Sequence, residues 1–322
     1  MKLMSIYVFF SFTPHRLHRK GISMKEKIKT FFSVCVLVIA IPYIVTLLFQ
    51  GDETSITENS TLAQTQESEI DVEEYVKGVV AKQISLESET ETLKAQTVIA
   101  RTMIVKAQEE GKELPESMDT QKLLELWGQK GFEEKYNVLE EAVAATKGEI
   151  LTWQGKPAEA AYHAVSAGVT RNGQVTLGRE DVPYLGVVDS EYDISSPNYL
   201  KVIFMEKTEL AEKLQKADNS LVLNPDEIPG NIQIIARDDS GYVTQVQIGT
   251  VTLSGEQFRQ YLELNSACFY IKEVEGQVRI LTKGLGHGLG LSQYGANEMA
   301  KKGKDYKEIL NYYYKGVELK TY

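Results

Sequence analysis

From residue 72 onward, hydrophobic residues recur with the spacing of an amphipathic helix. Val72, Val76, Val79 and Val80 fall at positions i, i+4, i+7 and i+8, which share one helical face. Gln83 follows at i+11 and, at about 100° per residue, returns to within about 20° of Val72. Because burial of a polar group without a hydrogen bond is costly, we expect Gln83 to meet a partner or a cleft.

The remaining patterns predict an α+β fold. A helical N-terminal part packs on a largely antiparallel β part, followed by a Gly-rich loop and C-terminal helices. Helices followed by strands, without regular alternation, favour this class over a βαβ repeat. The predicted helices are 72–83, 90–108, 119–147, 292–302 and one capped by Asp305. The predicted strands lie in 149–168 (with a turn at 155–157), 199–205, 231–237, 242–252 and 268–281.

An uncharged apolar run at residues 30–49 is long enough to cross a membrane as a helix. Lysines precede it and acidic residues follow, so the positive-inside rule places residues 1–29 in the cytoplasm. Residues 1–23 are either an upstream extension or part of this tail, because Met24 also resembles a natural start. No small-residue cleavage motif follows the run, which favours an uncleaved single-pass anchor in the cell membrane over a signal peptide.

The charge of the chain is unevenly distributed. Seven basic residues and one acidic residue lie in residues 1–30, although the whole chain has a net charge of −10. Residues 31–322 therefore carry a net charge of −16, which gives them no electrostatic footprint for nucleic acid. Residues 50–69 are polar and acidic, as expected of an extracytoplasmic linker, and residues 70–322 form the predicted extracytoplasmic domain.

His163 and His287 are the histidines of the 70–322 segment, and both lie among small residues. Glycines at every second position around His287 let the backbone approach a ligand closely, but no P-loop lysine follows them. We expect the two histidines to share a cleft. A zinc site would need a third ligand, which the sequence does not identify, so we predict no metal and no cofactor. Cys35 lies within the predicted anchor and Cys268 in the predicted extracytoplasmic domain, so the two form no disulfide framework.

Three segments carry a family resemblance that spans roughly residues 70–320. They are GLGHGLGLSQYGANEMAKKGKDYKEILNYYYKG at 284–316, EEYVKGVV with LKAQTVIART near the front, and, more loosely, ILTWQGKPAEAAYHAVSAGVT. The sequence resembles the stage II sporulation protein D family, whose domain is shared with amidase enhancers. The resemblance implies a lytic transglycosylase that cleaves peptidoglycan glycan strands and thins the septal wall for engulfment. It also implies two partners, stage II sporulation proteins P and M.

The resemblance assigns site residues as well. The family's catalytic residue is the Glu of a Val-Val-x-x-Glu-Met-Pro motif, and Gln83 occupies its position here. The predicted substrate-binding residues are Gln96, Arg101, His163, Ser166, His287, Ser292, Gln293 and Tyr294. The middle motif also departs from the family pattern, because Ala164 to Gly168 read AVSAG where Ser-x-Ser-Gly-Gly is usual. Cysteines that help to hold a metal in some relatives are absent.

Gln83 decides between the functional hypotheses. A glutamine amide cannot donate the proton that glycosidic cleavage needs, and general acid catalysis contributes about 10²–10⁴ in rate. We therefore expect a glycan-binding protein with weakened or lost catalysis. One alternative is an active transglycosylase with a relocated acid, for which Glu87, Glu89 and Glu91 are nearby candidates. The other is an amidase activator that acts through protein contacts.

Overall fold

The computed structural model describes residues 70–322. The predicted cytoplasmic tail, membrane anchor and linker lie outside these residues. Between residues 70 and 322, none of the helices has both the length and the apolar character that a membrane crossing needs.

The first helix, α2, covers Val72–Gln83, as the apolar spacing predicts. Asp71 caps it, because its carboxylate accepts hydrogen bonds from the N–H groups of Glu73 and Glu74. The valines of the predicted face are buried. Gln83 is the last helical residue, so its carbonyl has no partner within the helix and is available to a neighbouring element.

Two longer helices pack with α2 around a shared hydrophobic core. They are α3 (Thr90–Glu109) and α4 (Thr120–Ala145). The predicted helix at 119–147 is interrupted once, at Gly128, where the backbone is left-handed with φ 67°. Glycine adopts this conformation without the steric cost of a Cβ, so the chain bends there and then resumes the helix.

Short strands pair segments that lie far apart in the sequence. β1 (Glu149–Trp153) pairs antiparallel with β2 (Lys156–Pro157) and with β11 (Glu318–Thr321). The turn between β1 and β2 is formed by Gln154 and Gly155, so it overlaps the predicted turn only at Gly155, and Lys156 and Pro157 belong to β2. The C-terminal strand thus closes on the segment that follows the helices.

A second short pairing joins the two histidine-containing segments. β3 (Tyr162–His163) and β10 (Leu291–Ser292) run parallel, with His163 opposite Ser292. A short helix, α5 (Gly173–Leu177), and a 3₁₀ turn, η1 (Glu191–Ser195), follow β3. The two segments that carry the family resemblance around His163 and His287 are therefore direct neighbours.

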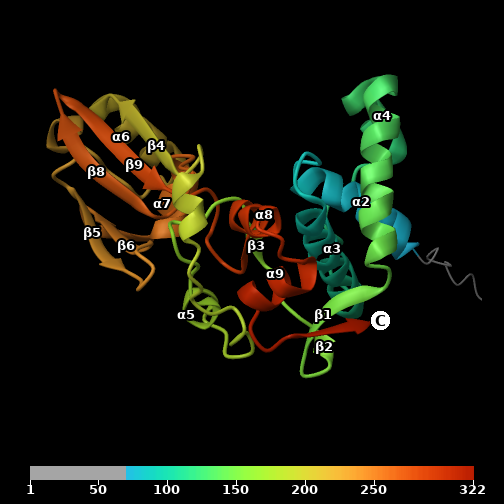
Figure 1. Cartoon of the computed structure of the whole chain (residues 1–322). Coiled ribbons are helices and arrows are strands. Elements are labelled where there is room, and N and C mark those ends of the chain that lie inside the picture. The colour runs from blue at the N-terminus through green and yellow to red at the C-terminus, as the bar shows by residue number, and fades with distance from the viewer. Residues whose placement is uncertain (1–69) are drawn as a thin grey trace, which may run out of the picture. The chain divides into compact units, whose positions relative to one another are not determined.

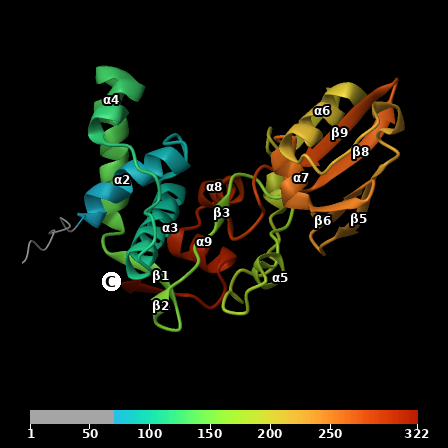
Figure 2. The ribbon, with the colours of Figure 1, turned by 180° about the vertical axis from the view of Figure 1, so that it is seen from behind.

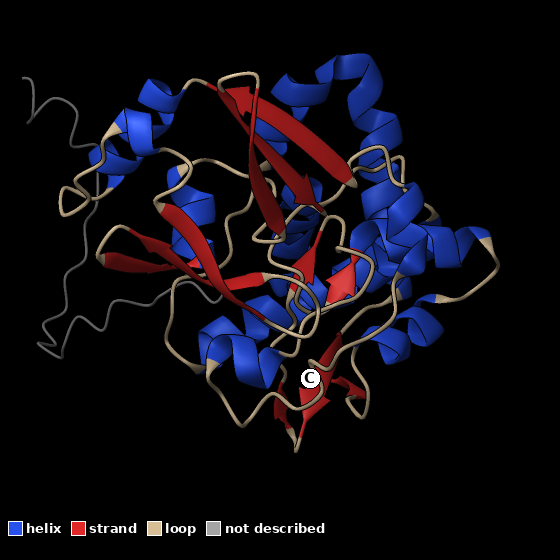
Figure 3. Cartoon of the chain, turned by 90° about the vertical axis from the view of Figure 1, so that its left-hand side faces the viewer, coloured by secondary structure: helices blue, strands red, loops and turns tan. Residues whose placement is uncertain are grey.

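Residues 200–283 contain two three-stranded antiparallel sheets, and we call this part the sheet lobe. The first sheet has the order β4-β9-β8 and the second the order β5-β6-β7, and they appear as separate sets of strands in Figure 3. The predicted strand segments 242–252 and 268–281 each contain two strands separated by a turn. The strands are β4 (Leu200–Met205), β5 (Ile232–Arg237), β6 (Val243–Ile248), β7 (Val251–Ser254), β8 (Phe269–Val274) and β9 (Gln277–Lys283).

Two helices of the sheet lobe do not follow from the sequence patterns above. α6 (Lys207–Ala217) buries Leu210, Ala211 and Leu214 against the sheets, and α7 (Gly255–Tyr261) buries Phe258. A 3₁₀ turn, η2 (Pro225–Glu227), lies between α6 and β5. The lobe thus has its own hydrophobic core.

The C-terminal helices connect the helical part to the sheet lobe. α8 (Gln293–Lys301) is capped by Ser292, and α9 (Tyr306–Tyr313) is capped by Asp305, as predicted. Both helices contact α3, and they lie between α3 and the sheet lobe in both views (Figure 1 and Figure 2). The fold is α+β, as predicted, with helices first and most strands later. The helices α2 to α4 share a core of their own, and α3 also packs on β1, α8 and α9.

Candidate functional site

Three glutamines from three helices meet at the C-terminal end of α2. The Gln96 amide on α3 donates to the Gln83 side-chain oxygen at 2.8 Å. Gln293, the first residue of α8, donates to the Gln83 carbonyl at 2.8 Å and to the Gln96 side-chain oxygen at 3.2 Å. Gln96 is fully buried, whereas Gln83 and Gln293 are half-buried and keep contact with solvent. The structure thus supplies the partner that the helical position of Gln83 demands.

The hydrogen-bond partners of the Gln83 side chain are uncharged. Its amide nitrogen lies 3.9 Å from the sulfur of Met103, and its other side-chain contact is Gln96. A side chain here is held by neutral amides and a thioether, without an ion pair. A glutamine in this setting can exchange hydrogen bonds with a sugar hydroxyl but has no acidic proton to give.

The nearby glutamates are engaged elsewhere or exposed. Glu91 forms an ion pair with Lys94 at 2.6 Å and accepts a hydrogen bond from the Tyr306 N–H at 2.9 Å. Glu87 and Glu89 are exposed to solvent. None of the three carboxylates forms a hydrogen bond with the glutamine cluster in the described part of the chain.

The two histidines lie side by side on the paired segments. Their ring centroids are 6.0 Å apart. His163 Nδ1 lies 3.0 Å from the Leu289 carbonyl, which can only accept, so Nδ1 carries the proton. His287 Nδ1 accepts a hydrogen bond from the Leu289 N–H at 3.1 Å. His163 is buried and His287 half-buried, so only the second can contact a ligand in this conformation.

The low dielectric around these rings disfavours their charged forms. Burial, together with the neighbouring His287, lowers the pKa of His163 to about 3. Burial also lowers the pKa of His287. Both imidazoles are therefore neutral at physiological pH.

Stability should consequently fall on acidification. Between pH 6.5 and 3 the unfolded state takes up a proton at His163 that the folded state refuses, which costs about 1.4 kcal/mol per pH unit. From pH 7 to pH 5 we expect the free energy of unfolding in urea to fall by about 2 kcal/mol from this group. The His163→Asn variant, whose amide can still donate to the Leu289 carbonyl, should lose this part of the slope. An unchanged slope in that variant would contradict the assignment.

Two glycines of the loop before α8 are required by close packing. Gly290 has φ 66°, and a Cβ there would lie 1.8 Å from the Ala161 carbonyl oxygen. At Gly286, with φ 113°, a Cβ would lie 2.8 Å from His163 Cβ. The glycines thus allow β10 to pair with β3 and place His287 against His163.

A buried carboxylate that the sequence patterns do not indicate organises the start of α8. Asp193 is fully buried and accepts hydrogen bonds from the Ser166 N–H at 2.7 Å, the Ser190 hydroxyl at 3.0 Å and the Ser292 hydroxyl at 2.8 Å. Burial raises the pKa of Asp193. Ser166 and Ser292 are fully buried as well, so in this structure they position α8 and the loop.

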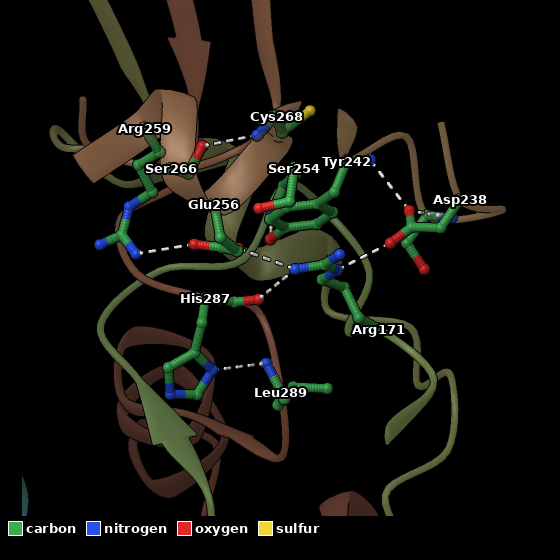
Figure 4. Close-up of polar contacts among 12 residues, drawn as sticks. Arg171, Asp238, Tyr242, Ser254, Glu256, Arg259, Ser266, Cys268, His287 and Leu289 are labelled. Atoms are coloured by element: carbon green, nitrogen blue, oxygen red, sulfur yellow. Dashed lines mark hydrogen bonds and ion pairs between the residues drawn. The ribbon is translucent and has the colours of Figure 1, made fainter. Parts of the chain in front are cut away.

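A second buried charge cluster joins the sheet lobe to the carbonyl of His287 (Figure 4). The Arg171 guanidinium binds Asp238 at 2.7 Å, Glu256 at 2.9 Å and the His287 carbonyl at 3.2 Å. It also stacks on the Tyr242 ring, 4.7 Å from the centroid. Arg171 is 3% exposed, so the loop and the lobe are linked through a desolvated cation.

Within residues 70–322, the side chains of Arg101 and Tyr294 form no hydrogen bond with the glutamines or the two histidines. The Arg101 guanidinium is fully buried and forms a two-pronged ion pair with Glu73 at 2.9 Å, away from the glutamines. The structure gives it a packing role between α3 and α2, and a sugar contact by Arg101 stays a prediction. Tyr294 is half-buried, and its N–H donates to the Ala164 carbonyl at 3.0 Å.

Of the nine residues that the sequence assigns to the site, four remain in contact with solvent. They are Gln83, His287, Gln293 and Tyr294. Within residues 70–322, no three His, Cys, Asp or Glu side chains come together in a way that could hold a metal ion. The accessible chemistry of the site is therefore that of amides, a neutral imidazole and a phenol.

Comparisons with known proteins agree with the resemblance. A family described as "Stage II sporulation protein" matches residues 60–153. The chain is 33% identical to stage II sporulation protein D of Bacillus amyloliquefaciens and 33% identical to that of Bacillus subtilis (strain 168). Both alignments cover 92% of this chain and 96% of the relative. The chain belongs to the stage II sporulation protein D family. It is also 25% identical to an amidase enhancer of Bacillus subtilis (strain 168), over 77% of this chain and 40% of that protein.

Membership in the stage II sporulation protein D family confirms the resemblance and the link to amidase enhancers. Two structural residues, Asp193 and Arg171, were not among the predicted site residues. Asp193 lies in the polar segment DSEYD, where nothing in the pattern marks burial. Arg171 directly follows the segment ILTWQGKPAEAAYHAVSAGVT, and its place at the end of a segment that carries the resemblance is a signal that could have found it.

Proposed function

We propose that this member of the stage II sporulation protein D family binds peptidoglycan glycan strands during sporulation and cleaves them weakly or not at all. The observation that carries the proposal is the uncharged cluster around Gln83, which occupies the position of the family's catalytic Glu. We further propose that residues 30–49 anchor it in the cell membrane, with residues 70–322 facing the wall.

Weak or absent cleavage follows from the lack of a proton donor at position 83. Cleavage of a glycosidic bond needs a group that protonates the leaving oxygen, and this step contributes about 10²–10⁴ in rate. Gln83 contacts two glutamines and a methionine, and the nearest glutamates are paired or solvated. Asp193 is a carboxyl group with a raised pKa, but it is fully buried and saturated with hydrogen bonds from serines. Among Glu87, Glu89, Glu91 and Asp193, none is at once accessible, sheltered from water and free of an ion pair, which disfavours the alternative with a relocated acid.

Binding of sugar needs no such proton. Gln83, Gln293 and Tyr294 are half-buried, and amide and phenol groups of this kind can pair with the hydroxyl and acetamido groups of a glycan. Wall remodelling at the septum, together with stage II sporulation proteins P and M, is the process in which we place this binding.

The test uses the full-length chain in a neutral detergent. Peptide-free glycan strands are incubated with the protein, and the bound strands and the soluble products are analysed by mass spectrometry. We expect retained strands without 1,6-anhydro ends. Anhydro products formed by the wild-type chain would refute the proposal, and so would the absence of strand binding.

The likeness to an amidase enhancer supports a second candidate, activation of a wall amidase through protein contacts. Under this candidate we expect a purified wall amidase to become more active when this chain is added. The activation should also occur on wall fragments to which the chain itself does not bind. Stimulation without strand binding would favour this candidate over the first.

A further inference from the structure

The first sheet of the sheet lobe has one open face. Side chains that are opposite one another in the register share a face, so Leu200, Val202 and Phe204 of β4 lie on the side away from the core. They are 53%, 45% and 55% exposed. Tyr270 of β8 lies on the same side and is 43% exposed. We call this side of the sheet the β4 face.

The β4 face is also basic. Arg279 and Lys283 on β9 and Lys272 on β8 lie on it by the same register, and no Asp or Glu does. None of the three cations forms an ion pair with another part of residues 70–322. A group of unpaired cations among exposed apolar side chains stands out on a chain whose residues after 30 carry a net charge of −16.

β4 is the edge of its sheet, and its outer backbone groups are unpaired. The Gly284 N–H donates to the Tyr199 carbonyl at 2.7 Å, which fixes the alternation of the antiparallel ladder. Lys201, Ile203 and Met205 then bond to β9. The N–H and C=O groups of Leu200, Val202 and Phe204 point away from it, and no other strand of the described chain pairs with them.

We propose that β4 accepts an extended acidic segment of a protein partner as an additional strand. Main-chain hydrogen bonds to Leu200, Val202 and Phe204 would hold the segment, as in other cases of strand addition. Strands lie about 4.8 Å apart, so Arg279 and Lys283 are about 10 Å from the added strand, within reach of carboxylates on its neighbouring side chains. Apolar side chains of the segment cover those of β4.

The unpaired backbone groups of β4 and the basic side chains favour an acidic protein strand over a lipid surface or a second copy of this chain. A lipid surface would match the apolar and basic side chains but would leave the row of N–H and C=O groups of β4 without partners. A second copy of this chain, added edge to edge, would place its own Arg279 and Lys283 on the same face about 14 Å away and would bring no carboxylate to these cations. The binding does not involve Gln83 and is independent of glycan recognition.

The probe is a fluorescein-labelled eight-residue peptide in which every second residue is threonine and the others alternate valine with glutamate. Its binding to the full-length chain in neutral detergent is followed by fluorescence anisotropy. We expect binding to the wild type and at least about tenfold weaker binding of a peptide with lysine in place of glutamate. Val202→Pro removes one outward N–H and should weaken binding of the acidic peptide about tenfold, since proline is tolerated at such an edge.

The double variant Arg279→Glu with Lys283→Glu should weaken binding by a similar factor, and Lys216→Glu on α6 serves as the matched control with no loss. Thermal unfolding of each variant verifies that the fold is kept. The proposal is overturned if the wild type does not bind the acidic peptide up to about 1 mM, or if Val202→Pro binds it as the wild type does. It is also overturned if vesicles of phosphatidylglycerol and phosphatidylethanolamine bind the β4 face in preference to the peptide, or if the chain dimerises through β4.

Discussion

Glutamate in place of Gln83 is expected to raise glycan-strand cleavage by about 10²–10⁴-fold over the wild-type chain. The Gln96 amide would still donate to one carboxyl oxygen, and the other oxygen would lie beside the Met103 sulfur. Within residues 70–322 no Lys or Arg forms a hydrogen bond with the Gln83 side chain, and partial burial disfavours the charged form of a carboxyl group. The new carboxyl group would therefore hold its proton to a higher pH than an exposed glutamate and could give it to the leaving oxygen.

The measurement is the yield of 1,6-anhydro ends from peptide-free glycan strands. Gln96→Glu is the matched control, because it puts a carboxyl group into the same cluster at a fully buried position, and Gln83→Ala removes the side chain. Both should remain as inactive as the wild type. Equal product yields from Gln83→Glu and Gln96→Glu would show that position 83 is not where the acid acts.

Replacement of Arg171 by methionine is expected to lower the free energy of unfolding by about 3–5 kcal/mol. The change leaves Asp238 and Glu256 without their shared cation, and the side chain of Asp238 is 11% exposed. It also removes the donor to the His287 carbonyl, one of the hydrogen bonds that join the loop carrying His287 to the sheet lobe. Urea unfolding of the full-length chain at pH 7 measures the effect.

Arg179→Met is the control for this experiment. Arg179 also binds two carboxylates, Glu159 and Asp181, but its side chain is 38% exposed. Exposed pairs contribute about 0–1 kcal/mol, so this variant should unfold almost like the wild type. If the two methionine variants lose the same stability, the link between the loop and the lobe is not what Arg171 provides.

Local patterns predicted much of the fold because several elements carry their own signals. The apolar spacing of α2 and the cap of α9 by Asp305 are both confirmed. α6 and α7 were not predicted, because they are short helices among strands and their apolar positions are also compatible with a sheet. The capping box at Ser254 and Gln257 is a local signal that would have indicated α7.

The site was predictable in part. The inward position of Gln83 follows from helical geometry, and the family resemblance added its glutamine partners. Which residues are buried does not follow from a motif. Ser166, Ser292 and Arg101 are matched by the resemblance, yet each lies fully inside the protein, because burial depends on contacts between segments far apart in the chain. The same holds for Asp193, whose three donors come from three separate segments.

The hydrogen bond from Gln293 to Gln83 spans 210 residues of sequence. A ribosome adds roughly 5–20 residues per second, so the end of α2 is made some 10 to 40 seconds before its partner on α8. During that interval the emerging chain has its first helices but lacks the group that completes the glutamine cluster. The glutamine cluster is therefore completed only after synthesis has passed α8, and a chain that ends before α8 lacks it.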